Sequence, residues 1–197
     1  RAIASYMRTQ TSLNSPIDRY LRGENVTISP QVIQGFNLFM GKAKCGTCHF
    51  APLYNGTVPP AYIEAESEVL GVPSKPITSG AMVSPDLGKF ALLQMDVHRH
   101  AFKTTTVRNA ALTAPYMHNG VYNTLDEVLD FYNRGGGAGI GISLPNQTLP
   151  PDPLNLTKEE LAALRGFIES LNDTSPITPP VRDFPRIPAG NRFVRKR

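Results

Sequence analysis

The pentapeptide Cys45-Gly46-Thr47-Cys48-His49 contains both cysteines of this 197-residue chain and is its most informative stretch. Its C-x-x-C-H spacing is the attachment signature of c-type haem, in which two thiols bond to the vinyl groups of a porphyrin and the adjacent imidazole ligates the iron. A redox C-x-x-C pair needs no following histidine, and a zinc site needs further Cys or His at ligand spacing. Because no other cysteine exists to complete such a site, the motif predicts one covalent haem c, held by Cys45 and Cys48 with His49 on the iron.

The composition predicts a single globular domain of short helices and long loops. Hydrophobic residues make up 41% of the chain and charged residues 18%, with 18 prolines and 16 glycines. A chain of this length can bury a core and enclose a cofactor. We expect no membrane span, because no apolar run approaches the length that a bilayer requires. Since c-type haem is attached outside the cytoplasm, we expect a periplasmic location, and we interpret the start at Arg1 as processing or truncation.

The net charge of +4 is concentrated at the C-terminal end. Residues 176–197 hold six basic side chains against Asp183 alone, a contribution of +5, so that the remaining 175 residues sum to −1. Such a tail can bind an acidic partner, lipid head groups or nucleic acid, but we favour a solvated or subunit-wrapping terminus. We expect no nucleic-acid partner, because no basic stripe is interleaved with aromatic residues.

Helical signals precede the motif. We expect short helices over residues 2–10 and from Ser15-Pro16 to Leu21. Ser29-Pro30 predicts a further helix start, with the hydroxyl at the N-cap and proline at the first helical position. Apolar residues then recur at helical spacing until Gly41, just before the motif: Val32, Ile33, Phe36, Phe39 and Met40.

The rest of the chain predicts a long loop and two more helices. Residues 50–100 carry six prolines and are expected to be mainly loop, with one helical turn near Ala61–Leu70. The tetrapeptides TLDE (124–127) and TKEE (157–160) are capping boxes that open helices with one apolar face, and a run of three glycines at 135–137 ends the first of them. One helix before a C-x-x-C-H motif and another near the end is the layout of a cytochrome c fold, so we expect an all-α cytochrome c-type fold with long loops around one haem.

Four segments make the sequence more specific than a generic cytochrome. The segments AFKTTTVRNAALTAPYMHNG (101–120) and TLDEVLDFYNRG (124–135) closely resemble the bacterial dihaem cytochrome c peroxidase and MauG family. The segments SPIDRYLRG (15–23) and GFNLFMGKAKC (35–45) are also similar to that family. The resemblance covers nearly everything from residue 2 to about residue 175.

The resemblance implies a division of labour between two haems. Family members have two cytochrome c domains, each with its own C-x-x-C-H, and this chain looks like the C-terminal one. It implies an interdomain stub at 1–28, a cytochrome c domain at 29–175 and a basic tail at 176–197. The expected function is a low-spin electron-transfer haem that works with a peroxide-reactive haem on a missing domain or partner chain. Expected partners are hydrogen peroxide at that second haem and a small electron-donor protein or protein substrate; the alternative is a monohaem electron-transfer or structural subunit without peroxidase activity.

The sixth iron ligand is predicted to be Tyr132, with Met117 as the alternative. By resemblance, this ligand comes from the helix that begins near Thr124, and Tyr132 also lies on the apolar face of that helix. It could instead be a core tyrosine whose hydroxyl bonds to backbone or to a haem propionate. A thioether favours ferrous iron, whereas a phenolate lowers the potential, so Tyr132 favours a MauG-like oxidase of a protein over a peroxide scavenger. We interpret Met117 as a packing residue; the remaining candidates are Met82, Met95, His98, His100 and His118.

Other residues are expected to serve the haem or the domain junction. Arg108 is predicted to bind the haem, as a partner of a propionate or an interdomain residue, and Tyr116 and His118 are further candidates for this role. His98 and His100 are expected to be exposed. By resemblance, the backbone carbonyls of Thr113 and Pro115 would help to hold a calcium ion between the two haem domains, with the remaining protein ligand from the absent half.

Overall fold

The computed structural model describes residues 1–9 and 11–175. The basic tail expected at 176–197 lies outside these residues. Ser12–Asp173 form one compact unit, while Arg1–Thr11 belong to another, in which helix α1 (Ala2–Thr9) buries none of its side chains. Residues 12–28, interpreted from the sequence as part of an interdomain stub, therefore pack with the domain that follows them. None of the described helices is long and apolar enough to cross a membrane.

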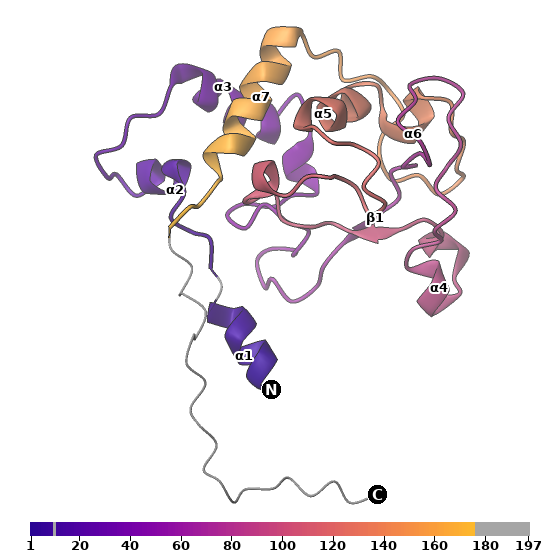
Figure 1. Cartoon of the computed structure of the whole chain (residues 1–197), viewed down its shortest axis with the longest axis horizontal. Coiled ribbons are helices and arrows are strands. Elements are labelled where there is room, and N and C mark those ends of the chain that lie inside the picture. Colours follow the sequence, from indigo (N-terminus) through magenta and orange to yellow (C-terminus); the bar gives the residue numbers. More distant parts are fainter. Residues whose placement is uncertain (10, 176–197) are drawn as a thin grey trace, which may run out of the picture. The chain divides into compact units, whose positions relative to one another are not determined.

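The compact unit is mostly helical and carries one two-stranded sheet (Figure 1). The elements in chain order are α2 (Pro16–Leu21), α3 (Pro30–Met40), the 3-10 turn η1 (Cys45–Thr47), β1 (Ser67–Glu68), α4 (Phe90–Leu93), η2 (Asp96–His98), β2 (Phe102–Lys103), η3 (Ala110–Leu112), α5 (Leu125–Asn133), α6 (Gly136–Gly139) and α7 (Lys158–Ser170). The all-α prediction is confirmed.

The predicted helix starts are confirmed by their capping bonds. The Ser29 hydroxyl accepts a hydrogen bond from the backbone of Val32 at the start of α3. Ser15, Thr124 and Thr157 each form a complete capping box, in which the N-cap side chain and the acidic side chain three residues later satisfy each other's backbone amides. These bonds pair amide groups that the first helical turn leaves without intrahelical partners.

The main core lies where α3 and α7 pack against each other (Figure 1). The closest approach is at Gly35, where a β-carbon would lie 2.0 Å from the carbonyl oxygen of Ala163. Any larger residue would force the helices apart. Aromatic rings fill the adjacent space: Phe39 packs edge-on against Phe167 at 5.2 Å and against Tyr54 at 5.8 Å. This contact fixes α3, which leads directly into the C-x-x-C-H motif.

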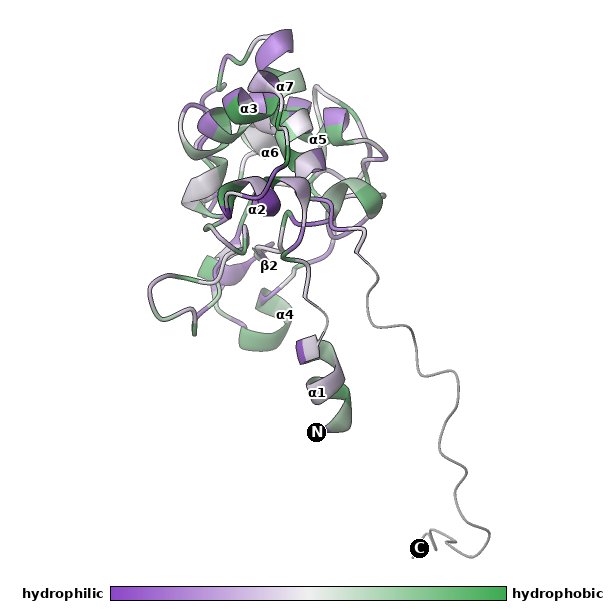
Figure 2. Cartoon of the chain, turned by 90° about the vertical axis from the view of Figure 1, so that its left-hand side faces the viewer, coloured by the Kyte–Doolittle hydropathy of each residue, from purple (hydrophilic) through white to green (hydrophobic). Residues whose placement is uncertain are grey.

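A second apolar cluster lies on the other side of α5. Its buried members are Ala81, Tyr122, Phe131, Ile140 and Ile142. Tyr132 and Met117 pack against it and are only partly buried. By contrast, α4 presents apolar colour to the surface in Figure 2, and its Leu92 is 84% exposed.

The expected helical turn near Ala61–Leu70 is wrong. This segment instead contains β1, which pairs antiparallel with β2 so that Ser67 faces Lys103 and Glu68 faces Phe102. A local pattern cannot reveal this, because the hydrogen-bond partners of β1 lie far away in the sequence. The glycine run after α5 does end that helix, but the chain then forms α6, where a β-carbon on Gly137 would lie 2.6 Å from the α-carbon of Gly71.

Candidate haem site

The attachment motif follows α3 as a tight turn. Lys44 adopts a left-handed conformation at φ 56°, and the backbone amide of His49 donates to the carbonyl of Cys45 at 2.9 Å. Both thiols are free, and burial raises the pKa of Cys45 to about 12. The turn therefore presents two protonated, unpaired thiols beside one imidazole, which is the donor set that covalent haem attachment requires.

His49 is oriented by the backbone. Its Nδ1 lies 3.2 Å from the carbonyl oxygen of Tyr54 and donates to it, which leaves Nε2 free for a metal. Burial lowers the pKa of His49, so its imidazole is neutral and can act as a ligand at neutral pH. Tyr54 itself is held in the main core, 3% exposed and packed on Phe39. The histidine is thus positioned by a carbonyl that cannot readily move.

Tyr132 lies close to the motif, although it comes from α5. Burial raises the pKa of Tyr132, and the nearby Cys45, Cys48 and Glu68 raise it further. Within residues 1–9 and 11–175, its hydroxyl makes no hydrogen bond. The hydroxyl lies near the two thiols, and its role as an iron ligand stays a prediction, with a bond to a haem propionate as the alternative. Together with His49, these groups fit a covalent haem with one nitrogen and one oxygen available to the iron.

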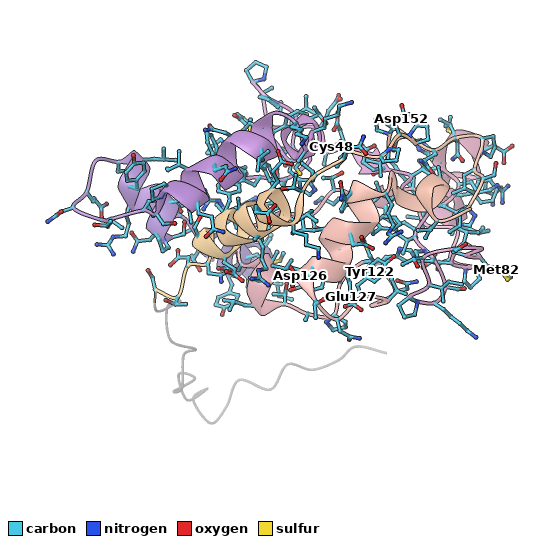
Figure 3. All side chains as sticks on the ribbon, turned by 90° about the horizontal axis from the view of Figure 1, so that it is seen from above. Cys48, Met82, Tyr122, Asp126, Glu127 and Asp152 are labelled. Atoms are coloured by element: carbon cyan, nitrogen blue, oxygen red, sulfur yellow. The ribbon has the colours of Figure 1, made fainter. Side chains whose placement is uncertain are left out.

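The other candidate ligands do not approach the motif in the same way. Met82 is 75% exposed and lies far from Cys48 in Figure 3, and Met95 is 54% exposed. His118 stacks on Phe102, with ring centroids 3.6 Å apart. Met117 packs on the second cluster beside Tyr132 and remains the alternative ligand.

The three downstream histidines are held by their own surroundings. The Nε2 of His118 lies 3.0 Å from the hydroxyl of the buried Ser84. The Nδ1 of His100 donates to the carbonyl of Asp86 at 2.8 Å. His98 and His100 are half-buried rather than exposed as the sequence suggested, and the contact with the Asp86 carbonyl holds His100 in place.

Arg108 is placed away from the role that the sequence suggested. It is 8% exposed and donates all five of its N–H groups within the chain: two to the carboxylate of Asp18, two to the carbonyl of Pro52 and one to the carbonyl of Ser12. No donor is left for a haem propionate, so the haem-binding prediction for Arg108 is not supported. The side chain instead ties α2 to the loop that carries Tyr54.

The expected calcium ligands lie on an exposed turn. Thr113 and Pro115 are both exposed, and no backbone amide in the described part of the chain donates to their carbonyls. The two oxygens are therefore available, and calcium binding stays a prediction. Tyr116, the next residue, instead has its amide bonded to the carbonyl of Tyr122 at 2.7 Å.

Two acidic residues near the motif were not identified from the sequence. Oxygen atoms of Glu66 and Glu68 and the sulfur of Cys48 all lie within 4.8 Å of one another. Burial raises the pKa of Glu66, and the neighbouring Glu68 raises it further. Alternation along a strand places residues i and i+2 on one face, so the E-x-E pattern at 66–68 was the available signal, but only a strand assignment would have revealed it.

The chain is similar to known haem peroxidases along most of its length, although no family model matches it. It is 36% identical over 182 residues to cytochrome-c peroxidase IdrP2 of Denitromonas iodatirespirans, which covers 86% of this chain and 47% of that protein. It is 37% identical over 207 residues to cytochrome-c peroxidase IdrP1 of Pseudomonas sp. strain SCT, which covers 95% of this chain and 52% of that protein. It is 30% identical over 172 residues to methylamine utilization protein MauG of Methylorubrum extorquens, which covers 86% of this chain and 42% of that protein. The chain thus spans about half the length of these relatives.

Solved structures agree with this similarity. A MauG-like protein associated with microbial copper homeostasis superposes with a TM-score of 0.67 at 30% identity, over 85% of this chain and 51% of that one. The diheme peroxidase BthA of Burkholderia thailandensis superposes at 0.55 with 21% identity, over 82% of this chain and 47% of that one, a likeness of fold.

Proposed function

Because the chain belongs to the family of bacterial dihaem cytochrome c peroxidases and MauG proteins, we propose that it is the C-terminal haem domain of such an oxidoreductase. In this role it provides a low-spin electron-transfer haem, while peroxide reacts at a second haem on another domain or partner chain. The observation that carries the proposal is the C-x-x-C-H turn, in which two free thiols lie beside His49 and the Tyr54 carbonyl holds the Nδ1 of that histidine. A protein or small electron donor would exchange electrons with this haem.

The residues of the chain divide the task of holding and tuning the cofactor. Bound haem c supplies one-electron transfer at its iron. Cys45 and Cys48 would hold the haem covalently, and the Nδ1–H bond of His49 to the Tyr54 carbonyl limits rotation of the imidazole, so that its Nε2 would bind the iron. Tyr132 would offer an oxygen ligand to the iron, which would favour oxidised iron and lower the potential relative to a thioether.

The axial ligand is tested by comparing two variants of the haem-loaded chain. Tyr132→Phe removes the phenol oxygen with little change in volume, and Met117→Leu removes the thioether of the alternative ligand. We expect only Tyr132→Phe to convert the oxidised haem from low spin to high spin, as seen in the electronic absorption and EPR spectra. A change on Met117→Leu, with none on Tyr132→Phe, would make Met117 the ligand.

The role in a dihaem enzyme is tested on the assembly purified from its source. Haem per polypeptide and native mass are measured together, followed by turnover with peroxide and a reduced donor. We expect two haems per functional unit and turnover of peroxide by the assembly. The isolated chain should show no turnover. A single haem at every native mass and no turnover would contradict the proposal and leave a monohaem electron-transfer or structural cytochrome.

Compartment and calcium follow from the same proposal. We propose a periplasmic location, because covalent haem c is attached outside the cytoplasm.

The carbonyls of Thr113 and Pro115 are proposed calcium ligands at the junction with the second haem domain. Titration of the two-domain protein with calcium, and with a chelator as control, would test that site.

A further inference from the structure

Glu68 stands out because it lies near several groups of the haem site at once. Its carboxylate is within 4.8 Å of the Cys48 sulfur. Burial sets the direction for both proposed iron ligands, lowering the pKa of His49 and raising that of Tyr132, and the charge of Glu68 adds a smaller raising effect on each pKa. A single carboxylate therefore lies beside a predicted thioether position.

The sheet directs this carboxylate toward the site. Glu68 pairs with Phe102 across β1 and β2, and Ser67 pairs with Lys103. Because successive side chains of a strand point to opposite faces, Glu68 and Phe102 share one face and Lys103 takes the other. Lys103 is accordingly exposed, while Glu68 is half-buried.

Among the described residues, no cation forms an ion pair with this carboxylate. In the part of the chain that the structure describes, neither Glu66 nor Glu68 forms an ion pair, and Glu66 adds a second carboxylate on the same side. A half-buried carboxylate is screened less by solvent and salt than an exposed one, so its field at a nearby redox centre is larger. Negative charge stabilises the oxidised, more positive state of a metal.

We propose that the negative charge of Glu68, together with that of Glu66, lowers the midpoint potential of the haem. The inference rests on the proposed function, since it requires a haem at Cys48. It concerns only charge at the ring edge and is independent of which residue supplies the sixth ligand.

The test is a spectroelectrochemical titration of the haem-loaded chain at a pH well above the carboxyl range. Glu68→Gln removes the charge and keeps the shape of the side chain, so it should raise the midpoint potential. At the wild-type midpoint, the ratio of reduced to oxidised haem should then increase by a factor on the order of 10. Glu68→Asp keeps the charge and should stay near wild type. Glu64→Gln is the matched control, because it removes the same charge from an exposed position in the same segment.

The outcomes separate this inference from the proposed function. Covalent haem is first confirmed from the pyridine haemochrome spectrum, and its absence would overturn both. If haem is present with unchanged axial spectra but Glu68→Gln and Glu66→Gln leave the potential unchanged, the inference fails and the proposed function stands. The same holds if Glu64→Gln shifts the potential as much as Glu68→Gln does. If Glu68→Gln binds haem poorly, the test rests on Glu66→Gln alone. We expect that variant to raise the midpoint potential, but by less than Glu68→Gln would.

Discussion

Removing one partner of the buried ion pair between Asp18 and Arg108 should cost more stability than removing one partner of any exposed pair described in the domain. Two N–H groups of Arg108 donate to the two carboxylate oxygens at 2.7 and 2.8 Å, and the two side chains are only 6% and 11% exposed. Asp18→Ala leaves a buried guanidinium with two of its five donors unmatched. Breaking such a pair from one side costs about 3–5 kcal/mol, which lowers the melting temperature of a domain this size by about 6–20 °C.

The assay is thermal and denaturant unfolding of the haem-loaded chain, followed by circular dichroism. Asp126→Ala is the matched control: Asp126 pairs with Arg165 at 2.8 Å, but the two side chains are 63% and 44% exposed, so the loss should stay below about 1 kcal/mol. Equal losses for the two variants would refute the reasoning, because they would mean that burial does not set the strength of the pair.

The same pair predicts a dependence on pH. Burial acts to raise the pKa of Asp18, but hydrogen bonds from Arg108 and Ser15 and the charge of Arg108 outweigh it, so that the pKa lies below its ordinary value. A carboxyl group of this kind stabilises the fold above its unfolded pKa of about 4, and the contribution disappears as pH falls through the folded pKa. The difference in stability between wild type and Asp18→Ala should therefore shrink in acid. A difference that is constant from about pH 7 to about pH 3 would contradict this.

Three further changes test the scaffold and the attachment chemistry. Gly35→Ala should destabilise the domain by about 1–3 kcal/mol in the same melts, because its β-carbon would meet the Ala163 backbone at 2.0 Å. Gly166→Ala is its control and should be neutral or stabilising, because the added β-carbon would meet only a side-chain atom, at 3.8 Å. Thr157→Ala removes the N-cap of α7 and should cost about 1 kcal/mol of unfolding free energy. Cys48→Ala should leave haem attached through one thioether, seen as a shifted pyridine haemochrome band with the chain-plus-haem mass still present; complete loss of covalent haem would show that Cys45 alone cannot hold it.

Features that depend on residues close together in the sequence could be predicted from the sequence. Serine and threonine N-caps marked four helix starts, because the capping bond joins residues three positions apart. Helical periodicity also placed Tyr132 on the inward face of α5, and the C-x-x-C-H motif needed no folding to be recognised. In each case the partner of the informative residue lies nearby in the sequence.

Long-range contacts could not be read in this way. The pairing of β1 with β2 placed Glu68 beside Cys48, and neither segment alone signals a strand of only two residues. The position of Arg108 depended on Asp18, whose segment the sequence suggested to be a linker. A basic residue in a segment that resembles a haem-protein family suggested a propionate role, and only the tertiary contacts showed that its N–H donors already have partners.

The contact between Gly35 and Ala163 also constrains the order of events during maturation. It joins helices that lie at opposite ends of the domain sequence, so α3 cannot gain its packing partner until nearly the whole domain has been synthesised. Until then, Cys45 and Cys48 sit on a segment whose scaffold is incomplete. In that interval both thiols are free of the packing that α7 later imposes on α3, so a porphyrin could be bonded to them before the domain is complete.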